Sequence, residues 1–277
     1  MTSLFPSPCP VLPGFNTLLI HGPYHWSAPI HLCLSHIAQH PESQAVILAP
    51  SRHQFRGGLL NCRDDWLNVH GGEGLITHFA SKVQILYPPK LPHLNFTLSL
   101  LHETQPSFKN FYNSKVSFSV SPSFLVLCEI SAYVEKAKDP TVSTYLSIVT
   151  RALATLDALS SQCVISPSLV IFDSRVGQLK LPILTPIVHH EDLREEEKIK
   201  SSPMAKSEPV LHFAGKYFDW VGSVHEDRNV DSRDPQCNRK CRLELSKRHN
   251  PETFISWKEY SSPGRHDAIV FVFEPSS

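Results

Sequence analysis

The sequence has no excess of charge of either sign. Its 26 lysines and arginines balance 26 aspartates and glutamates, and the isoelectric point is near 7.3. This balance argues against a protein whose binding is dominated by its overall charge, although it leaves room for a local basic patch. No apolar run approaches the 18 residues of a membrane-spanning helix, so we expect no membrane span. The first 13 residues are rich in proline and lack a basic segment, which argues against a cleaved secretory signal.

The seven cysteines are scattered and odd in number, and most of them lie within apolar stretches. Buried, reduced thiols fit this pattern better than a disulfide framework, and they are typical of the cytosol or the nucleus. The 277 residues suffice for one large or two small domains, and 41% hydrophobic residues allow a sizeable core. The 23 prolines predict loops and insertions.

Apolar runs alternate with segments suited to helices over the first two thirds of the chain. The runs are continuous rather than alternating with polar residues, which is typical of strands buried on both faces of a parallel sheet. We therefore predict an α/β fold with a mostly parallel central sheet flanked by helices. The predicted strands are residues 15–20, 45–49, 83–87, 124–128 and 168–172, and the predicted helices are 30–40, 91–103 and 141–162, with short helices and a glycine turn within 53–80.

The pattern changes beyond residue 172. Residues 189–209 are charged and contain proline and serine, which predicts a solvated linker or loop. The predicted domain layout is a flexible leader at 1–14, a core at 15–188, this linker, and C-terminal strands at 210–277 that complete the same domain. Those strands are predicted at 210–218, 242–245, 254–259 and 268–273, the last two as a hairpin.

The turn after the first predicted strand has the context of a phosphate-binding loop without its working residues. When the G-x-x-x-x-G-K-[ST] motif is laid on this turn, Gly22 takes the first glycine. Ser27, Ala28 and Pro29 then take the second glycine, the lysine and the Ser/Thr. Ala28 carries no charge, and Pro29 has neither a hydroxyl nor a backbone N–H, so neither can do the work of the motif.

A working site of this kind also needs an aspartate for magnesium at the end of a nearby strand. The fourth predicted strand ends in Cys128-Glu129 instead. We interpret Gly22, Ser27, Ala28, Pro29, Cys128 and Glu129 as a vestigial nucleotide site, with Cys128 expected to end the strand next to the first one. The alternative is that Gly22 and its neighbours form an ordinary turn between a strand and a helix. The sequence thus predicts a pseudo-ATPase with no catalytic residues, no cofactor and doubtful ATP binding.

Three further blocks carry a resemblance to a known family. They are Lys82-Val-Gln-Ile-Leu-Tyr-Pro-Pro89 with the leucine-rich stretch 94–101, Phe124-Leu-Val-Leu-Cys-Glu-Ile-Ser-Ala-Tyr133 with its amphipathic helix, and Tyr217-Phe218 with Trp220 and Trp257. In this order and spacing, the chain resembles the SWIM-type zinc finger 7 associated proteins, which are divergent RecA-family recombinase paralogues of the Shu complex. The resemblance covers residues 15–180 and, more weakly, 210–273.

The resemblance implies a RecA-like P-loop NTPase core and a nuclear role in homologous recombination and DNA repair. It also implies three kinds of partner: a SWIM zinc-finger protein, a RecA-family recombinase or its paralogues, and single-stranded DNA. A leucine-rich helix beside a rigid Pro-Pro turn makes Tyr87, Pro88, Leu98 and Leu101 candidate partner-binding residues. The roles of the insertions 53–80 and 104–122 stay open.

A basic cluster near the C-terminus is a candidate DNA contact, although a solvated hairpin edge is an equally good interpretation. The cluster consists of Arg239, Lys240, Arg242, Lys247 and Arg248. Within it, Cys237 and Cys241 have a spacing seen in zinc sites, but nothing specifies a full set of four ligands, so we expect no metal.

The alternative from another class is an α/β-hydrolase-like enzyme. His21-Gly22 after an apolar strand resembles an oxyanion segment, and Asp173 with His189-His190 could serve as triad partners. That reaction needs a G-x-S-x-G nucleophile elbow, which the sequence lacks.

Overall fold

The structure is a computed structural model that describes residues 2–101, 121–163, 165–183, 207–227, 237–247, 250–262 and 265–273. Its centre is a nine-stranded sheet in the order β11-β10-β9-β8-β1-β5-β4-β2-β3. The strands of this sheet are β1 (Thr17–His21), β2 (Ala45–Leu48), β3 (Val83–Leu86), β4 (Phe124–Cys128), β5 (Ser168–Asp173), β8 (Trp220–Asp227), β9 (Cys237–Lys247), β10 (Asn250–Ser262) and β11 (Arg265–Phe273).

The six strands from β8 to β3 in this order are parallel, and β9, β10 and β11 continue the sheet in antiparallel pairs. Every residue of β2, β4 and β5 is buried, as their continuous apolar runs predict. The predicted fold class is confirmed: a mixed α/β fold with a large, mostly parallel sheet, helices, and antiparallel strands at its C-terminal end.

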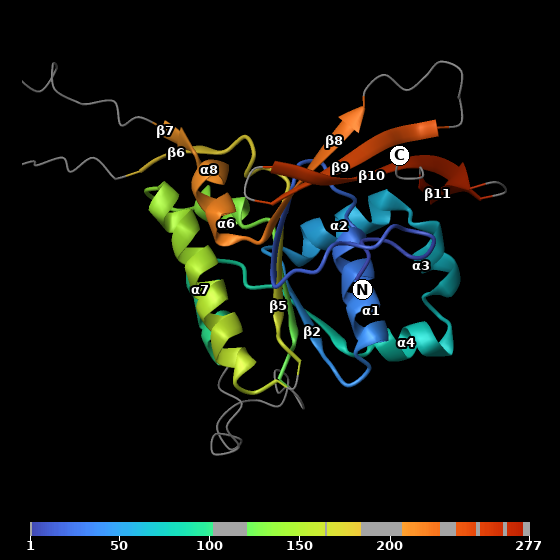
Figure 1. Cartoon of the computed structure of the whole chain (residues 1–277), viewed down its shortest axis with the longest axis horizontal. Helices are drawn as coiled ribbons and strands as arrows, with labels where there is room; N and C mark the ends of the chain where they lie inside the picture. The colour runs from blue at the N-terminus through green and yellow to red at the C-terminus, as the bar shows by residue number, and fades with distance from the viewer. Residues whose placement is uncertain are drawn as a thin grey trace, which may run out of the picture.

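Helices cover both faces of the parallel strands (Figure 1). The helices are α1 (Ala28–Gln39), α2 (Arg52–Cys62), α3 (Asp65–His70), α4 (Gly74–Ala80), α5 (Leu91–Leu100), α6 (Ser131–Val134), α7 (Val142–Ser160) and α8 (Val210–Ala214). Leu32 and Ile37 of α1 pack in one core cluster, whereas Leu98 of α5 and Tyr145 of α7 pack in the other, across the sheet. None of the helices in the described ranges combines the length and apolar composition that a bilayer crossing requires.

The N-terminal segment is packed, in contrast to the flexible leader predicted for residues 1–14. Leu4, Phe5 and Leu12 are buried. The Phe5 ring lies 4.4 Å from that of Phe271 and 5.4 Å from that of Trp257, measured between centroids. The prolines of this segment are visible in the sequence, but the packing of Phe5 on rings of β10 and β11, more than 250 residues away, is not.

Two expectations for the C-terminal third need correction. Residues 210–218 form α8 and a 3₁₀ turn (Gly215–Tyr217), not a strand, because a short apolar run does not distinguish the two by periodicity. The sequence also gave no sign of β8, which lies parallel to β1. Only residues 207–209 of the predicted linker are described, as β7 (Ser207–Pro209), which pairs with β6 (Lys180–Pro182); the rest of it and most of the insertion 104–122 lie outside the described residues.

Candidate functional site

The turn from β1 to α1 lies at the carboxyl end of the central parallel strands, where open α/β sheets bind their ligands. Gly22 opens the turn with φ at +91°, a conformation that favours glycine. A Cβ atom there would lie 2.3 Å from the carbonyl oxygen of Val224 on β8. Gly22 is therefore required by the close approach of the turn to β8, with no phosphate involved.

Four backbone amides of this turn have partners within the protein. The amide of Tyr24 donates to Gly22 O at 2.8 Å, and that of Ala28 donates to His25 O at 2.9 Å. The Trp26 amide donates to Sγ of Cys62, and the Ser27 amide faces Nδ1 of His25 at 3.4 Å. A phosphate-binding loop presents such amides to its ligand, whereas these are already used inside the fold.

The first turn of α1 is closed in the same way. Both Ile30 and His31 donate their amides to the carbonyl oxygen of Ser27. Pro29 has no amide hydrogen, and Ser27, Ala28 and Pro29 are all buried. The helix N-terminus therefore presents no exposed donors from these residues to an anion.

The side chain of Tyr24 folds over the carboxyl ends of the strands. Its ring packs 5.1 Å from the ring of Phe172 on β5, and its hydroxyl donates to Oε1 of Glu129 at 2.7 Å. Burial, together with the nearby charges of Cys128 and Glu129, raises the pKa of the Tyr24 hydroxyl well above its usual value. A protonated tyrosine thus occupies the space between the loop and β4.

Glu129 follows β4 in a left-handed backbone conformation, with φ at +54°. Besides the Tyr24 hydroxyl, its carboxylate accepts the Ser174 hydroxyl at 2.8 Å and the Ser174 amide at 3.2 Å. The carboxylate is buried, and every one of these bonds comes from the protein. The strand of Cys128 was expected beside β1, but β5 lies between them, and Tyr24 reaches Glu129 across it.

A second buried carboxylate, Asp173 at the end of β5, lies beside Glu129. It accepts the hydroxyl of Ser131 at 2.7 Å and that of Tyr145 at 3.1 Å. Burial, and secondarily the charge of Glu129, raises the pKa of Asp173 to about 6. Sequence reasoning identified Glu129 but not Ser131, Tyr145 or Ser174. Ser131 and Ser174 follow buried strands closely, which was an available signal, whereas Tyr145 lies within α7 and had no such signal.

The histidines near the loop form part of its packing. His25 Nδ1 lies 2.7 Å from Oγ of Ser27, and His31 Nε2 lies 2.7 Å from Oδ2 of Asp64. Burial lowers the pKa of His25 to about 4. Within the described residues, no group of three or more His, Cys, Asp or Glu side chains is arranged to hold a metal ion.

The predicted basic cluster is divided between two faces of β9. Arg239 points inward, where it pairs with Glu226 at 3.0 Å and donates to the carbonyl oxygen of Pro23 at 2.7 Å. Lys247 is on that same face and lies over the ring of Trp220 at 5.6 Å. Lys240 and Arg242 alternate with these residues and point to the opposite face, and Arg248 lies outside the described residues. The five residues therefore do not form one patch.

The predicted partner-binding residues are mostly interior. Leu98 and Leu101 are buried in the core beneath α7, and Pro88 is buried with its carbonyl oxygen accepting from the hydroxyl of Tyr133. Tyr87 is half-buried. Leu98 and Leu101 are thus not surface residues, because the leucine-rich face of α5 is the face that packs; Phe96, at 56% exposure, is on the outside.

The described residues show no catalytic triad that would support the hydrolase alternative. The carboxylate of Asp173 bonds to Ser131, Tyr145 and the Arg175 amide. The two histidines proposed to complete a triad, His189 and His190, lie outside the described residues.

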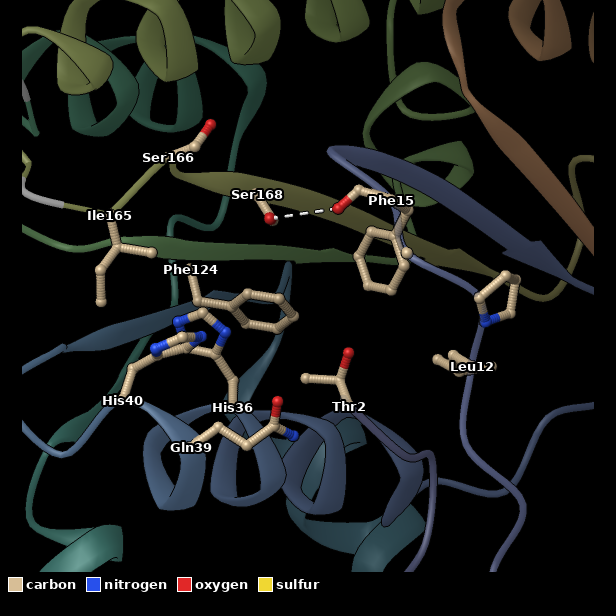
Figure 2. A pocket seen from close by; sticks show the side chains of 12 residues that line it. Thr2, Leu12, Phe15, His36, Gln39, His40, Phe124, Ile165, Ser166 and Ser168 are labelled. Atoms are coloured by element: carbon tan, nitrogen blue, oxygen red, sulfur yellow. Dashed lines mark hydrogen bonds between the residues drawn. The ribbon is translucent and has the colours of Figure 1, made fainter.

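A small cavity of about 160 Å³ lies at the other end of the sheet. Figure 2 shows the rings of His36 and His40 next to Phe124 at this cavity, which the N-terminal segment and Phe15 help to line. His36 stacks on Phe124 with 4.4 Å between centroids, and its Nε2 lies 3.0 Å from Oγ of Ser123. These bonds are structural, and the cavity is remote from the turn after β1.

Comparison with known proteins adds a similarity of structure. No family model matches the sequence. No curated protein matches it either. Among solved structures, the chain is similar to the RadB recombinase, with 13% identity, 92% of this chain and 91% of that chain covered, and a TM-score of 0.48.

Proposed function

We propose that this chain is a non-catalytic, RecA-like subunit of a Shu-type mediator complex, related to the SWIM-type zinc finger 7 associated proteins. In this role it assists the assembly of recombinase filaments on single-stranded DNA during homologous recombination and DNA repair in the nucleus. Its partners would be a SWIM zinc-finger protein and a RecA-family recombinase or paralogue. It would contribute surfaces held by the sheet, without nucleotide hydrolysis.

The observation that carries this proposal is the closed turn after β1. Tyr24 covers the strand ends and bonds to Glu129, while the amides of Tyr24, Trp26, Ser27 and Ala28 have partners within the protein. Phosphate would have to displace these bonds without a lysine to offset the cost. A pseudo-ATPase fits this arrangement better than an enzyme does.

The topology supports the recombinase-type core. The turn leaves a central strand, β1, which has parallel neighbours on both sides, and the carboxylate after β4 lies within reach of the turn. The proposal of a Shu-type complex in particular is based on the sequence resemblance of the blocks around Tyr87, Phe124 and Trp220.

Nucleotide binding provides the first test. A ligand at 100 times its dissociation constant stabilises a protein by about 2.7 kcal/mol, which is several degrees of melting temperature at ~2–4 °C per kcal/mol. We expect no shift with millimolar Mg-ATP and no hydrolysis above background, with an intact recombinase as the positive control. A clear shift or turnover would refute the pseudo-ATPase role.

The complex is tested separately. Co-expression with a SWIM zinc-finger protein from the same cell should give a stable, co-purifying pair, and the pair should accelerate loading of the recombinase on single-stranded DNA. Failure to co-purify would remove the Shu-type assignment whatever the nucleotide result.

A further inference from the structure

Helix α2 presents positively charged side chains to solvent on the side that faces away from the core. Phe55, with 1% exposure, anchors the opposite side of the helix. Arg52, Arg56 and Leu60 follow at intervals of four residues, so they lie along one side of the helix. His53 precedes Leu60 by two helical turns and lies on that same side. All four residues are exposed, Leu60 by 64%, and we call them the α2 stripe.

The α2 stripe has no acidic counterpart in its own helix. α2 contains arginine and histidine but neither aspartate nor glutamate. Among the residues that the structure describes, Arg52 and Arg56 form no ion pair with a carboxylate. Arg52 lies in the first turn, where the helix dipole disfavours a cation, and Arg52 and Arg56 are like charges four residues apart. These charges oppose the stability of the helix, and a bound acidic group would offset that effect.

The acids that follow α2 in the chain are engaged elsewhere. Asp64 is buried, and its Oδ2 lies 2.7 Å from Nε2 of His31. Asp65 lines the cavity beside β11, and Glu73 pairs with His70 at 2.6 Å. None of these three carboxylates is an ion-pair partner of the α2 stripe.

The candidate site consists of side chains and not of the helix N-terminus. The hydroxyl of Ser51 accepts the amide of Gln54 at 3.3 Å, and the carbonyl oxygen of Ser51 accepts the amide of Phe55 at 3.0 Å. These bonds cap the helix from within the protein. An acidic ligand would therefore be held by the guanidinium groups.

The turn after β3 extends the positive charge beyond α2. Burial raises the pKa of the Tyr87 hydroxyl, and the positive charge of the nearby Arg52 opposes that rise. The Tyr87 ring also packs on the ring of Phe55, with 6.3 Å between centroids. Lys90, three residues further along, is exposed. The turn beside the α2 stripe thus contributes a further cation.

The composition of the α2 stripe favours an acidic protein segment over nucleic acid. Guanidinium groups bind carboxylates through paired hydrogen bonds. Leu60 offers a large apolar side chain in line with the two arginines, and a sugar–phosphate backbone has no apolar side chain to pack on it. Within α2, all of which the structure describes, the single aromatic ring is that of Phe55, which is buried and cannot stack on a base.

We propose that the α2 stripe docks a short acidic segment of a partner protein, with carboxylates on Arg52 and Arg56 and an apolar side chain on Leu60. The stripe spans about 12 Å, so the segment is about two helical turns long. The inference rests on the proposed function for which partner supplies the segment, whereas the chemistry of the segment follows from the α2 stripe alone.

The test begins with the immobilised full chain and a phage-displayed library of random 12-residue peptides as the probe. The enriched peptides should carry aspartate or glutamate next to leucine, isoleucine or phenylalanine, at a frequency above that of the input library. Enrichment of peptides without this acidic excess would overturn the proposal.

Charge reversal then locates the binding. Arg56→Glu should weaken the enriched peptides about tenfold or more without lowering the melting temperature, because glutamate suits a helix as well as arginine does. Lys138→Glu is the matched control, since Lys138 is an exposed lysine between α6 and α7 and the change in net charge is identical. Equal losses in the two variants would show that only overall charge matters and would refute the α2 stripe as the site.

The apolar contact has its own matched pair of variants. Leu60→Ser should weaken the peptides about tenfold, the size of one lost leucine contact. Leu75→Ser is the control, because Leu75 on α4 has the same 64% exposure, and it should leave the affinity unchanged. Full affinity in Leu60→Ser would contradict the proposed contact.

Nucleic acid is the competing ligand class. A labelled 30-nucleotide deoxythymidine strand should bind the wild type and Arg56→Glu equally, or bind neither. If the strand displaces the peptides from the wild type and binds Arg56→Glu less tightly, the α2 stripe belongs to nucleic acid and the acidic-segment proposal is wrong.

Failure of this proposal and failure of the proposed function give different results. If the SWIM protein co-purifies equally with the wild type and Arg56→Glu and no acidic peptide is enriched, only the α2 stripe is refuted. If acidic peptides bind the α2 stripe but the SWIM protein does not co-purify, the docking surface stands and the Shu-type assignment fails.

Discussion

The hydroxyl of Tyr24 donates a 2.7 Å hydrogen bond to the buried carboxylate of Glu129, 105 residues further along the chain. This bond joins the turn after β1 to the end of β4, across the intervening strand β5. In an active nucleotide-binding site this space would hold a phosphate and its metal ion. Here a side chain of the protein fills it.

Replacement of Tyr24 by phenylalanine should therefore destabilise the protein. The change removes one donor and leaves Oε1 of Glu129 with only the Ser174 amide, so the free energy of unfolding should fall by about 1–3 kcal/mol. Urea denaturation measures the loss. Tyr217→Phe is the control, because Tyr217 is exposed; equal stability of the two variants would show that the Tyr24 bond contributes little.

Gly22 should tolerate no side chain. Gly22→Ala would combine a left-handed backbone with a Cβ at 2.3 Å from Val224 O, so β1 and β8 would have to separate. We expect a loss of at least about 1–3 kcal/mol. Gly57→Ala is the matched control, since Gly57 lies in α2 with open space around it, and it should stabilise by about 0.4–1 kcal/mol. A neutral Gly22→Ala in thermal melts would contradict the tight approach.

The sequence was sufficient to predict five of the six parallel strands, but neither β8 nor the contacts that close the site. Continuous apolar runs located β4 at its observed bounds and the other core strands to within two residues, because burial on both faces leaves a direct trace in composition. The side-chain direction of Tyr24 leaves no such trace. It depends on β5 lying between β1 and β4, which is a property of the strand order and not of any local segment.

The same distinction explains the errors in the proposed surfaces. Charge runs and leucine runs identify a residue type, but the face on which each residue lies depends on strand register and helix packing. Arg239 and Arg242 are three residues apart and point to opposite sides of β9, and Leu98 points inward while Phe96 points outward.

The two faces of α5 should respond differently to truncation. Leu98 has no exposed surface, so Leu98→Ala should cost about 2–5 kcal/mol through the lost burial and the cavity left behind. Phe96→Ala, at 56% exposure, should change stability by less than about 0.5 kcal/mol. Chemical denaturation of both variants checks this. A partner pull-down that weakens only in Phe96→Ala would move the predicted partner surface of this helix to its outer side.

The free energy of unfolding should fall in mild acid, because the buried histidines resist protonation in the folded protein. Burial lowers the pKa of His21, His25 and His36 to about 4, so the unfolded chain takes up these protons first as the pH drops below 6.5. Stability from each histidine is complete above about pH 6.5 and is lost as the pH falls toward 4. Asp173 acts in the opposite direction, because its raised pKa of about 6 lets the folded protein take up a proton first between pH 6 and 4. Burial also raises the pKa of Glu259, which therefore acts in the same direction as Asp173. Three histidines against these two carboxylates leave a net loss of stability.

His36→Gln isolates one of these contributions. Glutamine does not titrate, and it can keep a hydrogen bond to Ser123, so the variant should lose about 2 kcal/mol less than the wild type between pH 7 and pH 5. Urea midpoints at the two pH values give the comparison, with the exposed His53→Gln as the control. If His36→Gln and the wild type lose the same stability, the ring of His36 takes up its proton in the folded state, and the cavity beside it in Figure 2 admits enough water to solvate the charge.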